Sequence, residues 1–113
     1  MKVSYEEIGQ VLVTCPAAAG VAEGGMVTLG TDGKAAPCKK GERFFGQAVS
    51  VAEDGFAAVQ VRGFITVACA DGTVAPGWAA LAGDGAGGVE KAVEGGGEVL
   101  VMEADGERAV LCL

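Results

Sequence analysis

The sequence predicts an all-β protein, built as a small β-barrel or a two-sheet sandwich with an internal pseudo-twofold duplication. Three observations lead to this prediction. Short Val- and Ala-rich runs of alternating character recur along the 113 residues. Glycine accounts for 20 residues, well above its usual share of about 7%, and separates these runs. Asp-Gly pairs, which favour tight hairpin turns, occur at five places, namely Asp32, Asp54, Asp71, Asp84 and Asp105.

Nine extended runs are expected, and no segment shows the i, i+3, i+4, i+7 recurrence of a long amphipathic helix. The runs are 8–14, 26–29, 35–38, 45–52, 57–70, 78–81, 89–93, 98–104 and 108–113. The run 57–70 is the longest and has Gly63 in its middle. An interior glycine usually marks a bulge or a bend, so we expect one strand to pass from one sheet to another there.

The order of strands and turns is used twice along the chain. Met26 aligns with Trp78 at an offset of 52 (78 minus 26), and Val59 aligns with Val110 at an offset of 51 (110 minus 59). The expected half-repeats are about 20–66 and 72–113. Two copies are too few for a solenoid, so the repeat predicts one duplicated β domain over 8–113, preceded by a flexible N-terminal arm at 1–7.

Charge excludes several classes of partner. The net charge is -7 and the isoelectric point is near 4.4, so phosphate backbones and anionic lipid surfaces would repel the protein. We therefore expect no direct nucleic-acid partner and no membrane contact.

The sequence contains neither an apolar run of about 20 residues nor the pattern of a signal peptide. This predicts a protein made in the cytoplasm.

The side-chain inventory predicts a protein that is not an enzyme. Histidine is absent, which removes the most common proton-transfer group and metal ligand. We expect no catalytic residue, no cofactor and no metal, and we interpret the Asp-Gly pairs as hairpin turns rather than calcium ligands. No two of the four cysteines are close in sequence, so they are expected to be free and to fill the core, although two disulfides are possible by number.

Three aromatic residues are candidates for a subunit or partner interface. Trp78 begins an expected strand after a Pro-Gly pair, so it is either a core residue or an exposed anchor. Phe44 and Phe45 are adjacent, and successive strand residues face opposite sides. At least one of these two rings should then leave the core of its own chain, unless the strand is buried on both faces.

The ordered pattern of the chain resembles the small capsid cement, or head decoration, proteins of tailed bacteriophages and prophages. The resemblance rests on segments 20–29 (GVAEGGMVTL), 46–49 (GQAV), 59–65 (VQVRGFI) and 74–81 (VAPGWAAL). It implies an all-β protein that binds the outer surface of the mature head and stabilises it. It further implies a homotrimer whose partner is the major capsid protein, and a location on the virion after assembly in the host cytoplasm.

Two other functions stay open. Segment 72–81 (GTVAPGWAAL) resembles biotinyl and lipoyl carrier barrels, which are also duplicated, but Lys34 lacks the setting of the modified lysine of those domains. A small ligand-binding or carrier barrel is therefore the alternative from another class. A tail component or another structural protein of the virion is the second alternative.

The N-terminal arm carries the last group of expected interface residues. Val3 and Tyr5 share one face of an extended strand, and Ile8 follows them. Such an arm is either a frayed end or a segment that adds a strand to the exposed sheet edge of a neighbouring protein.

Overall fold

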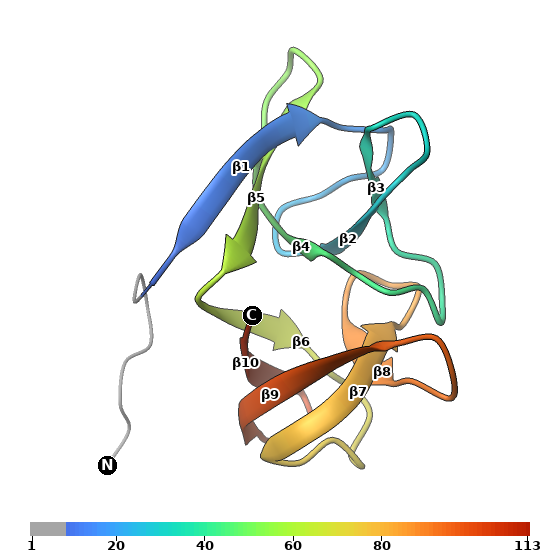
Figure 1. Cartoon of the computed structure of the whole chain (residues 1–113), viewed down its shortest axis with the longest axis vertical. Helices are drawn as coiled ribbons and strands as arrows, with labels where there is room; N and C mark the ends of the chain where they lie inside the picture. Colours follow the sequence, from blue (N-terminus) through green and yellow to red (C-terminus); the bar gives the residue numbers. More distant parts are fainter. Residues whose placement is uncertain (1–8) are drawn as a thin grey trace.

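The computed structural model describes residues 9–113, which form ten strands and contain no helix (Figure 1). The strands are β1 (Val11–Pro16), β2 (Met26–Leu29), β3 (Ala35–Pro37), β4 (Gly46–Val51), β5 (Phe56–Arg62), β6 (Phe64–Ala68), β7 (Gly77–Gly83), β8 (Val89–Lys91), β9 (Gly97–Ala104) and β10 (Arg108–Cys112). They form two antiparallel five-stranded sheets that pack together. The predicted all-β, two-sheet architecture is confirmed.

The longest expected run is divided at Gly63, which is why nine runs give ten strands. β5 belongs to the first sheet and β6 to the second, and Gly63 between them has a φ of 97°. Only glycine adopts this backbone region easily. The backbone N–H of Leu113 donates a hydrogen bond of 2.8 Å to the Gly63 carbonyl oxygen and fixes the bend. The expected passage of the chain between sheets at this glycine is confirmed.

The two sheets have the same topology. The strand orders are β1-β5-β4-β2-β3 and β6-β10-β9-β7-β8, so adding five to each strand of the first sheet gives the second. Each sheet also has a β-bulge at the same place, with Val49 extra in β4 and Met102 extra in β9. The sheets divide the chain at Gly63, between β5 and β6. β1 and β6 each join the sheet through a strand far along the chain, a pairing that local patterns do not reveal.

The register of the sheets corrects one part of the expected alignment. Relative to the two bulges, Val59 corresponds to Leu111, an offset of 52 (111 minus 59), and not to Val110. Val59 and Leu111 are both completely buried, whereas Val110 is half-buried. A shift of one residue exchanges the two faces of a strand, so the alignment at an offset of 51 is wrong in this region.

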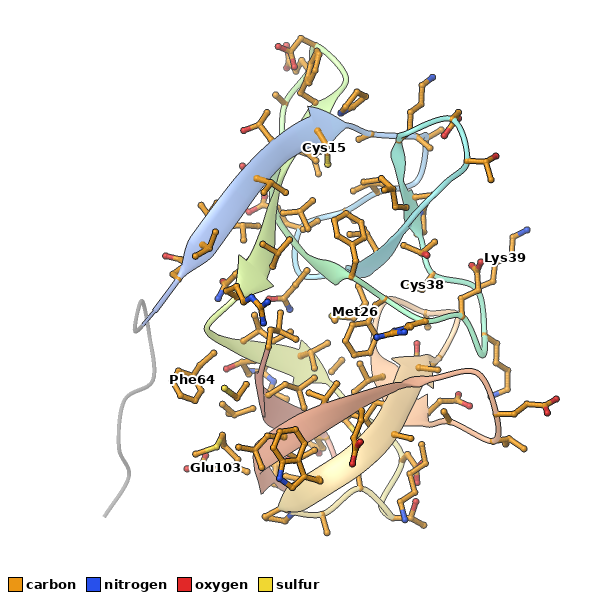
Figure 2. All side chains as sticks on the ribbon, viewed as in Figure 1. Cys15, Met26, Cys38, Lys39, Phe64 and Glu103 are labelled. Carbon is orange, nitrogen blue, oxygen red and sulfur yellow. The ribbon has the colours of Figure 1, made fainter. Side chains whose placement is uncertain are left out.

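The interior consists of two apolar clusters, and the larger of them joins the two halves. The smaller one lies on the first sheet and contains Val27, Ala35, Ala48, Ala57 and Val59. The larger one is built mainly from the second sheet, but it also includes Met26, Cys38 and Phe44 from the first half. Figure 2 shows Met26 at the junction between the sheets. This larger cluster, the second cluster below, is therefore completed by residues from the first half of the chain.

Two buried glutamines strengthen this junction. Gln47 donates hydrogen bonds to the carbonyl oxygens of Gly24 at 3.0 Å and Thr66 at 2.9 Å, which lie in different halves. Gln60 donates to the carbonyl oxygens of Arg62 at 3.0 Å and Phe64 at 3.1 Å, on both sides of the bend. Buried amide groups need such partners, because an unsatisfied polar group is costly.

The first sheet curls until its two edge strands meet at one end. Ala17, just after β1, forms a parallel bridge with Ala35 of β3. The backbone N–H of Ala18 donates a hydrogen bond of 2.8 Å to the Ala35 carbonyl oxygen.

No helix in residues 9–113 has the length and apolar character needed to span a membrane.

Candidate interaction surfaces

Met26 and Trp78 occupy equivalent places in the two sheets but lie in opposite environments. Met26 pairs with Gln47 of β4, and Trp78 pairs with Leu100 of β9, the residue that corresponds to Gln47 when the two bulges are aligned. Met26 is 1% exposed and Trp78 is 71% exposed. Of the two alternatives given for Trp78, the core position is therefore wrong. The second half of the chain covers this face of the first sheet, whereas no described residue covers Trp78 to the same extent. The other alternative, an exposed aromatic side chain, is what the structure contains.

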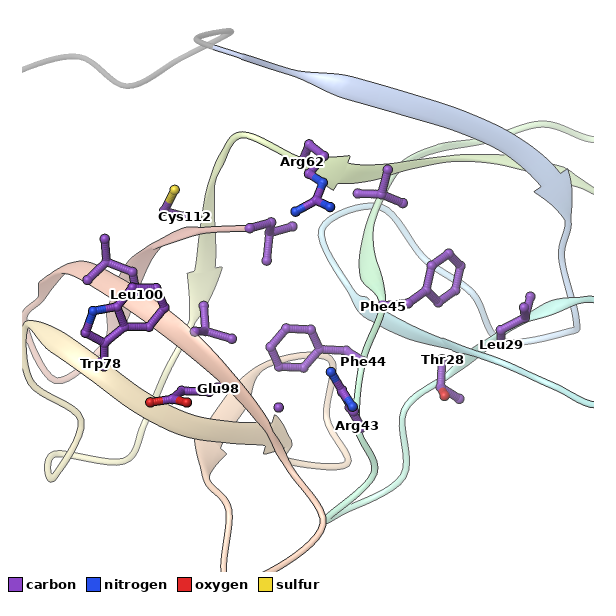
Figure 3. A pocket seen from close by; sticks show the side chains of 14 residues that line it. Thr28, Leu29, Arg43, Phe44, Phe45, Arg62, Trp78, Glu98, Leu100 and Cys112 are labelled. Atoms are coloured by element: carbon purple, nitrogen blue, oxygen red, sulfur yellow. The ribbon is translucent and has the colours of Figure 1, made fainter.

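Trp78 stands on the rim of a groove between the two sheets (Figure 3). The groove has a volume of about 720 Å³. The first half contributes Thr28, Leu29, Arg43, Phe44, Phe45, Val61 and Arg62, and the second half contributes Trp78, Gly97, Glu98, Val99, Leu100, Cys112 and Leu113. All three candidate aromatic residues within the described chain therefore meet around one groove.

Phe44 and Phe45 lie just before β4, and their rings enter different clusters. Phe44 is 9% exposed and belongs to the cluster of the second sheet. Phe45 is half-buried and packs against the cluster of the first sheet. β4 begins at Gly46, one residue later than expected, so neither ring belongs to the strand. Both rings pack against clusters of their own chain, and neither leaves the core as expected. These rings line the groove but do not project from it as Trp78 does.

Opposite charges lie on the two walls of the groove. Arg43 and Arg62 are exposed on the wall from the first half, and Glu98 is exposed on the wall from the second half. The side chain of Arg43 passes over Gly97, where an added Cβ would lie 2.9 Å from Arg43 Nε. Within the described chain, no ion pair joins either arginine to Glu98. The groove thus combines apolar side chains with separated charges that have no ion partner across it.

Strand β1 forms a second exposed apolar surface. It lies at the edge of the first sheet and, among residues 9–113, pairs with β5 as its only strand partner. Val11, Leu12 and Val13 are 48%, 46% and 39% exposed. Natural edge strands commonly carry charges that prevent pairing with another chain, and β1 contains none. The signal for this surface in the sequence is an apolar run without Lys, Asp or Glu.

The other three expected interface residues, Val3, Tyr5 and Ile8, lie outside the described residues. The described chain begins at Gly9 and leads directly into β1. The side chain of Gln10 donates a hydrogen bond of 3.1 Å to Gln60 Oε1, which positions the start of β1 near the bend between the sheets.

The five Asp-Gly pairs are turns. In each, a carboxylate oxygen accepts a hydrogen bond from the backbone N–H two residues later, at 3.0 Å for Asp32, 3.2 Å for Asp54, 2.9 Å for Asp71, 2.7 Å for Asp84 and 2.9 Å for Asp105. This geometry is an Asx turn, in which the side chain reproduces a backbone hydrogen bond. Residues 9–113 contain no group of three or more potential ligands that could hold a metal ion.

Asp71 has a further structural role. Its carboxylate accepts hydrogen bonds from the Thr73 hydroxyl at 2.6 Å, the Thr73 N–H at 2.9 Å and the Lys91 N–H at 3.0 Å. The Thr73 hydroxyl, followed by these N–H groups, lowers the pKa of Asp71 from 3.8 to about 2. Because Lys91 belongs to β8 and Asp71 follows β6, the carboxylate links the two edges of the second sheet.

All four cysteines are free, and two of them are buried. Burial, followed by the charge of Glu42, raises the pKa of Cys38 from 9.0 to about 11. Burial is also the main cause that raises the pKa of Cys69. Because the thiolate is the reactive form, neither thiol is suited to nucleophilic chemistry at neutral pH.

Comparisons with protein-family models, curated proteins and solved structures yield no match for this chain.

Proposed function

We propose that the protein is a non-enzymatic head decoration protein of a tailed bacteriophage, which binds the major capsid protein on the outer surface of the mature head and stabilises the shell. The sequence pattern that resembles this family supports the proposal. The observation that carries it in the structure is the exposed, uncharged edge strand β1.

An exposed strand edge offers unpaired backbone N–H and C=O groups to another protein. A second strand that pairs with β1 gains backbone hydrogen bonds, and its side chains also contact the exposed Val11 and Leu12. Apolar contact and backbone pairing do not require a basic surface, which suits a chain of net charge -7. Strand β1 is therefore the surface that we assign to the shell.

The arm at 1–7 precedes β1 in the sequence. Its apolar residues Val3 and Tyr5, with Ile8 next to them, could add side-chain contacts to the pairing made by β1. Three copies acting together would multiply this contact, since linked sites bind a shared surface with higher avidity. The homotrimer implied by the family resemblance is part of this proposal.

The test is binding of the purified full chain to heads of the encoding phage that lack it. Bound protein is measured after sedimentation of the heads. Leu12→Lys places a charge on the edge strand and should weaken binding by about tenfold or more, because edge lysines oppose strand pairing. Val93→Lys is the matched control, since Val93 is 98% exposed on a loop and its replacement should leave binding unchanged. Binding of Leu12→Lys at the wild-type level would exclude β1 as the contact.

Deletion of residues 1–7 tests the arm separately. The truncated chain should keep the circular dichroism spectrum of the full chain, because β1 begins only at Val11. It should also bind heads more weakly. Unchanged affinity would show that the arm makes no contact with the shell. Binding to tails instead of heads would favour the tail-component alternative.

The groove supports a second candidate function, the binding of a small ligand. Its volume of about 720 Å³ lies within the range of roughly 300–1,000 Å³ that is typical of ligand sites. Native mass spectrometry of protein from its natural source distinguishes the two functions. A stoichiometric bound small molecule, or a lipoyl or biotinyl group on Lys34 or Lys91, would favour the ligand or carrier alternative. The unmodified chain mass without a bound molecule favours the decoration protein.

A further inference from the structure

We propose that copies of this chain bind one another by inserting Trp78 of one copy into the groove of the next, where Leu29 and Phe45 receive the indole and Arg62 attracts Glu98. The proposed function includes a homotrimer, and this inference rests on the proposed function only in expecting several copies to associate. Self-association is measured without heads, so either idea can fail while the other stands.

The internal duplication provides the first argument. In the first sheet, the face that carries Met26 is covered by the second half of the chain. Met26 enters the cluster of the second sheet, and its backbone N–H donates a hydrogen bond of 3.0 Å to the Gly87 carbonyl oxygen. Gln47, on the neighbouring strand, is held by Thr66 of β6. In the folded chain this face is therefore buried against a second β unit.

The same face of the second sheet has no comparable cover within residues 9–113. Trp78, Leu100 and Cys112 form a row across β7, β9 and β10, since Trp78 pairs with Leu100 and Leu100 with Cys112. Trp78 is 71% exposed, and the other two are half-buried. The row replaces Met26, Gln47 and Gln60 of the first sheet with a large aromatic, an aliphatic and a thiol side chain. An uncovered row of this kind is typical of a protein interface.

The groove beside Trp78 provides a matching receptor. Leu29 is 56% exposed on the first-half wall, and the half-buried Phe45 ring lies next to it along the groove (Figure 3). The volume of about 720 Å³ is more than an indole needs. Aromatic side chains prefer to contact other rings edge-to-face or offset, and Phe45 offers such a contact. The groove is also continuous with the internal junction, because Phe44 belongs both to its lining and to the second cluster.

Charge favours a second copy as the occupant. The wall that carries Trp78 also carries the acidic Glu98, and the receiving wall carries the basic Arg43 and Arg62. When Trp78 of one copy enters the groove of another, its Glu98 approaches the arginines of that second copy. One chain thus contains both halves of a complementary contact, which is what homo-oligomers require.

Each copy carries both a donor and an acceptor, so the contact closes when two copies exchange indoles or when several copies form a ring. Every copy in a closed ring gives one indole and receives one. The net charge of -7 opposes close approach at low ionic strength. At physiological salt the Debye length is about 8 Å, so remote repulsion is screened while the contact remains.

The experiment is sedimentation velocity of the full chain over a range of concentrations at physiological salt, with tryptophan fluorescence recorded on the same samples. Trp78 is the only tryptophan, so its emission reports directly on the proposed contact. A closed oligomer should form as the concentration rises, and the emission maximum should move to shorter wavelength in parallel.

Variants identify the residues. Trp78→Ala should weaken association by about thirtyfold or more, because buried tryptophans are among the strongest contributors to interfaces. Glu98→Arg and Arg62→Glu should each weaken it by about fivefold, and the double variant should recover most of the loss. Val93→Ala, at a residue 98% exposed on a loop, is the control that should associate like wild type.

Three results would overturn the inference. One is a chain that stays monomeric at every concentration. Another is wild-type association of Trp78→Ala, which would place the interface elsewhere. The third is an emission maximum that does not change while the oligomer forms. Circular dichroism of each variant checks that it folds, and the charge-exchange pair keeps the test valid even if Trp78→Ala does not fold.

Discussion

Met26 and Trp78 hold the same position in two sheets of identical topology, yet the first is buried between the sheets and the second points outward. The duplication therefore produces one internal interface and leaves its counterpart uncovered. Both the groove and the proposed contact between copies follow from this difference between the covered face around Met26 and the uncovered face around Trp78. The edge strand β1 is a separate feature and faces a different partner in our proposal.

Replacing these two residues should have very different effects on stability. Met26→Ala should lower the free energy of unfolding by about 2–5 kcal/mol, because it leaves a cavity in a buried cluster. Trp78→Ala in the dilute monomer should change it by less than about 0.5 kcal/mol, as expected for an exposed side chain. Urea denaturation at low protein concentration measures both. A loss of several kcal/mol for Trp78→Ala would mean that the indole packs within its own chain.

Gly63→Ala should destabilise the fold by about 1–3 kcal/mol, because the φ of 97° at this bend disfavours any residue with a Cβ. Gly72→Ala is the matched control. Gly72 lies outside the positive-φ region, and an added Cβ there meets no atom within 4 Å. Thermal unfolding followed by circular dichroism compares the two variants. Equal melting temperatures would contradict the structural role assigned to Gly63.

The carboxylate of Asp71 should make the stability depend on acid pH. Its pKa falls from 3.8 to about 2 on folding, so its contribution is present above pH 4 and is lost as the pH falls through about 2. Thr73→Ala removes the hydroxyl that is the main cause and should raise the pKa of Asp71. Carboxyl titration by nuclear magnetic resonance measures the pKa directly. An unchanged pKa in Thr73→Ala would contradict the assigned cause.

Thiol labelling should divide the cysteines into two pairs. Cys38, with a pKa of about 11, and Cys69 are buried and should react slowly in the folded protein. Cys15 and Cys112 are half-buried and should react first. Mass spectrometry after timed labelling at pH 8 assigns the modified residues. In urea all four should react at similar rates, and rapid labelling of Cys38 in the native protein would contradict its burial.

Local signals in the sequence predict most of the fold. Alternating runs and Asp-Gly turns locate nine strand segments, and Gly63 marks the passage between sheets, because these features depend on neighbouring residues. Sheet order depends on pairing between distant segments, so the place of β1 beside β5 was not predicted. The one-residue error in the expected alignment of Val59 arose from the Asp-Gly turns that anchored it. Asp54 precedes Ala57 by three residues (57 minus 54), whereas Asp105 precedes the equivalent Ala109 by four (109 minus 105).

The candidate surfaces were only partly predictable. The sequence identifies Trp78 as an unusual residue but does not tell a core position from a surface one, since both suit a large aromatic side chain. Phe44 and Phe45 could not be placed in two clusters, because their separation depends on how the two halves pack. The groove itself unites residues from β2 to β10, and its charges become complementary walls only in three dimensions.

The central claim is that this chain decorates a phage head through β1. Cryo-electron microscopy of mature heads from the encoding phage, with and without the protein, tests it most directly. We predict additional density on the outer surface that fits the two five-stranded sheets, with β1 against the shell. Heads that show no difference on their outer surface, or density for the chain only in the tail, would contradict the claim.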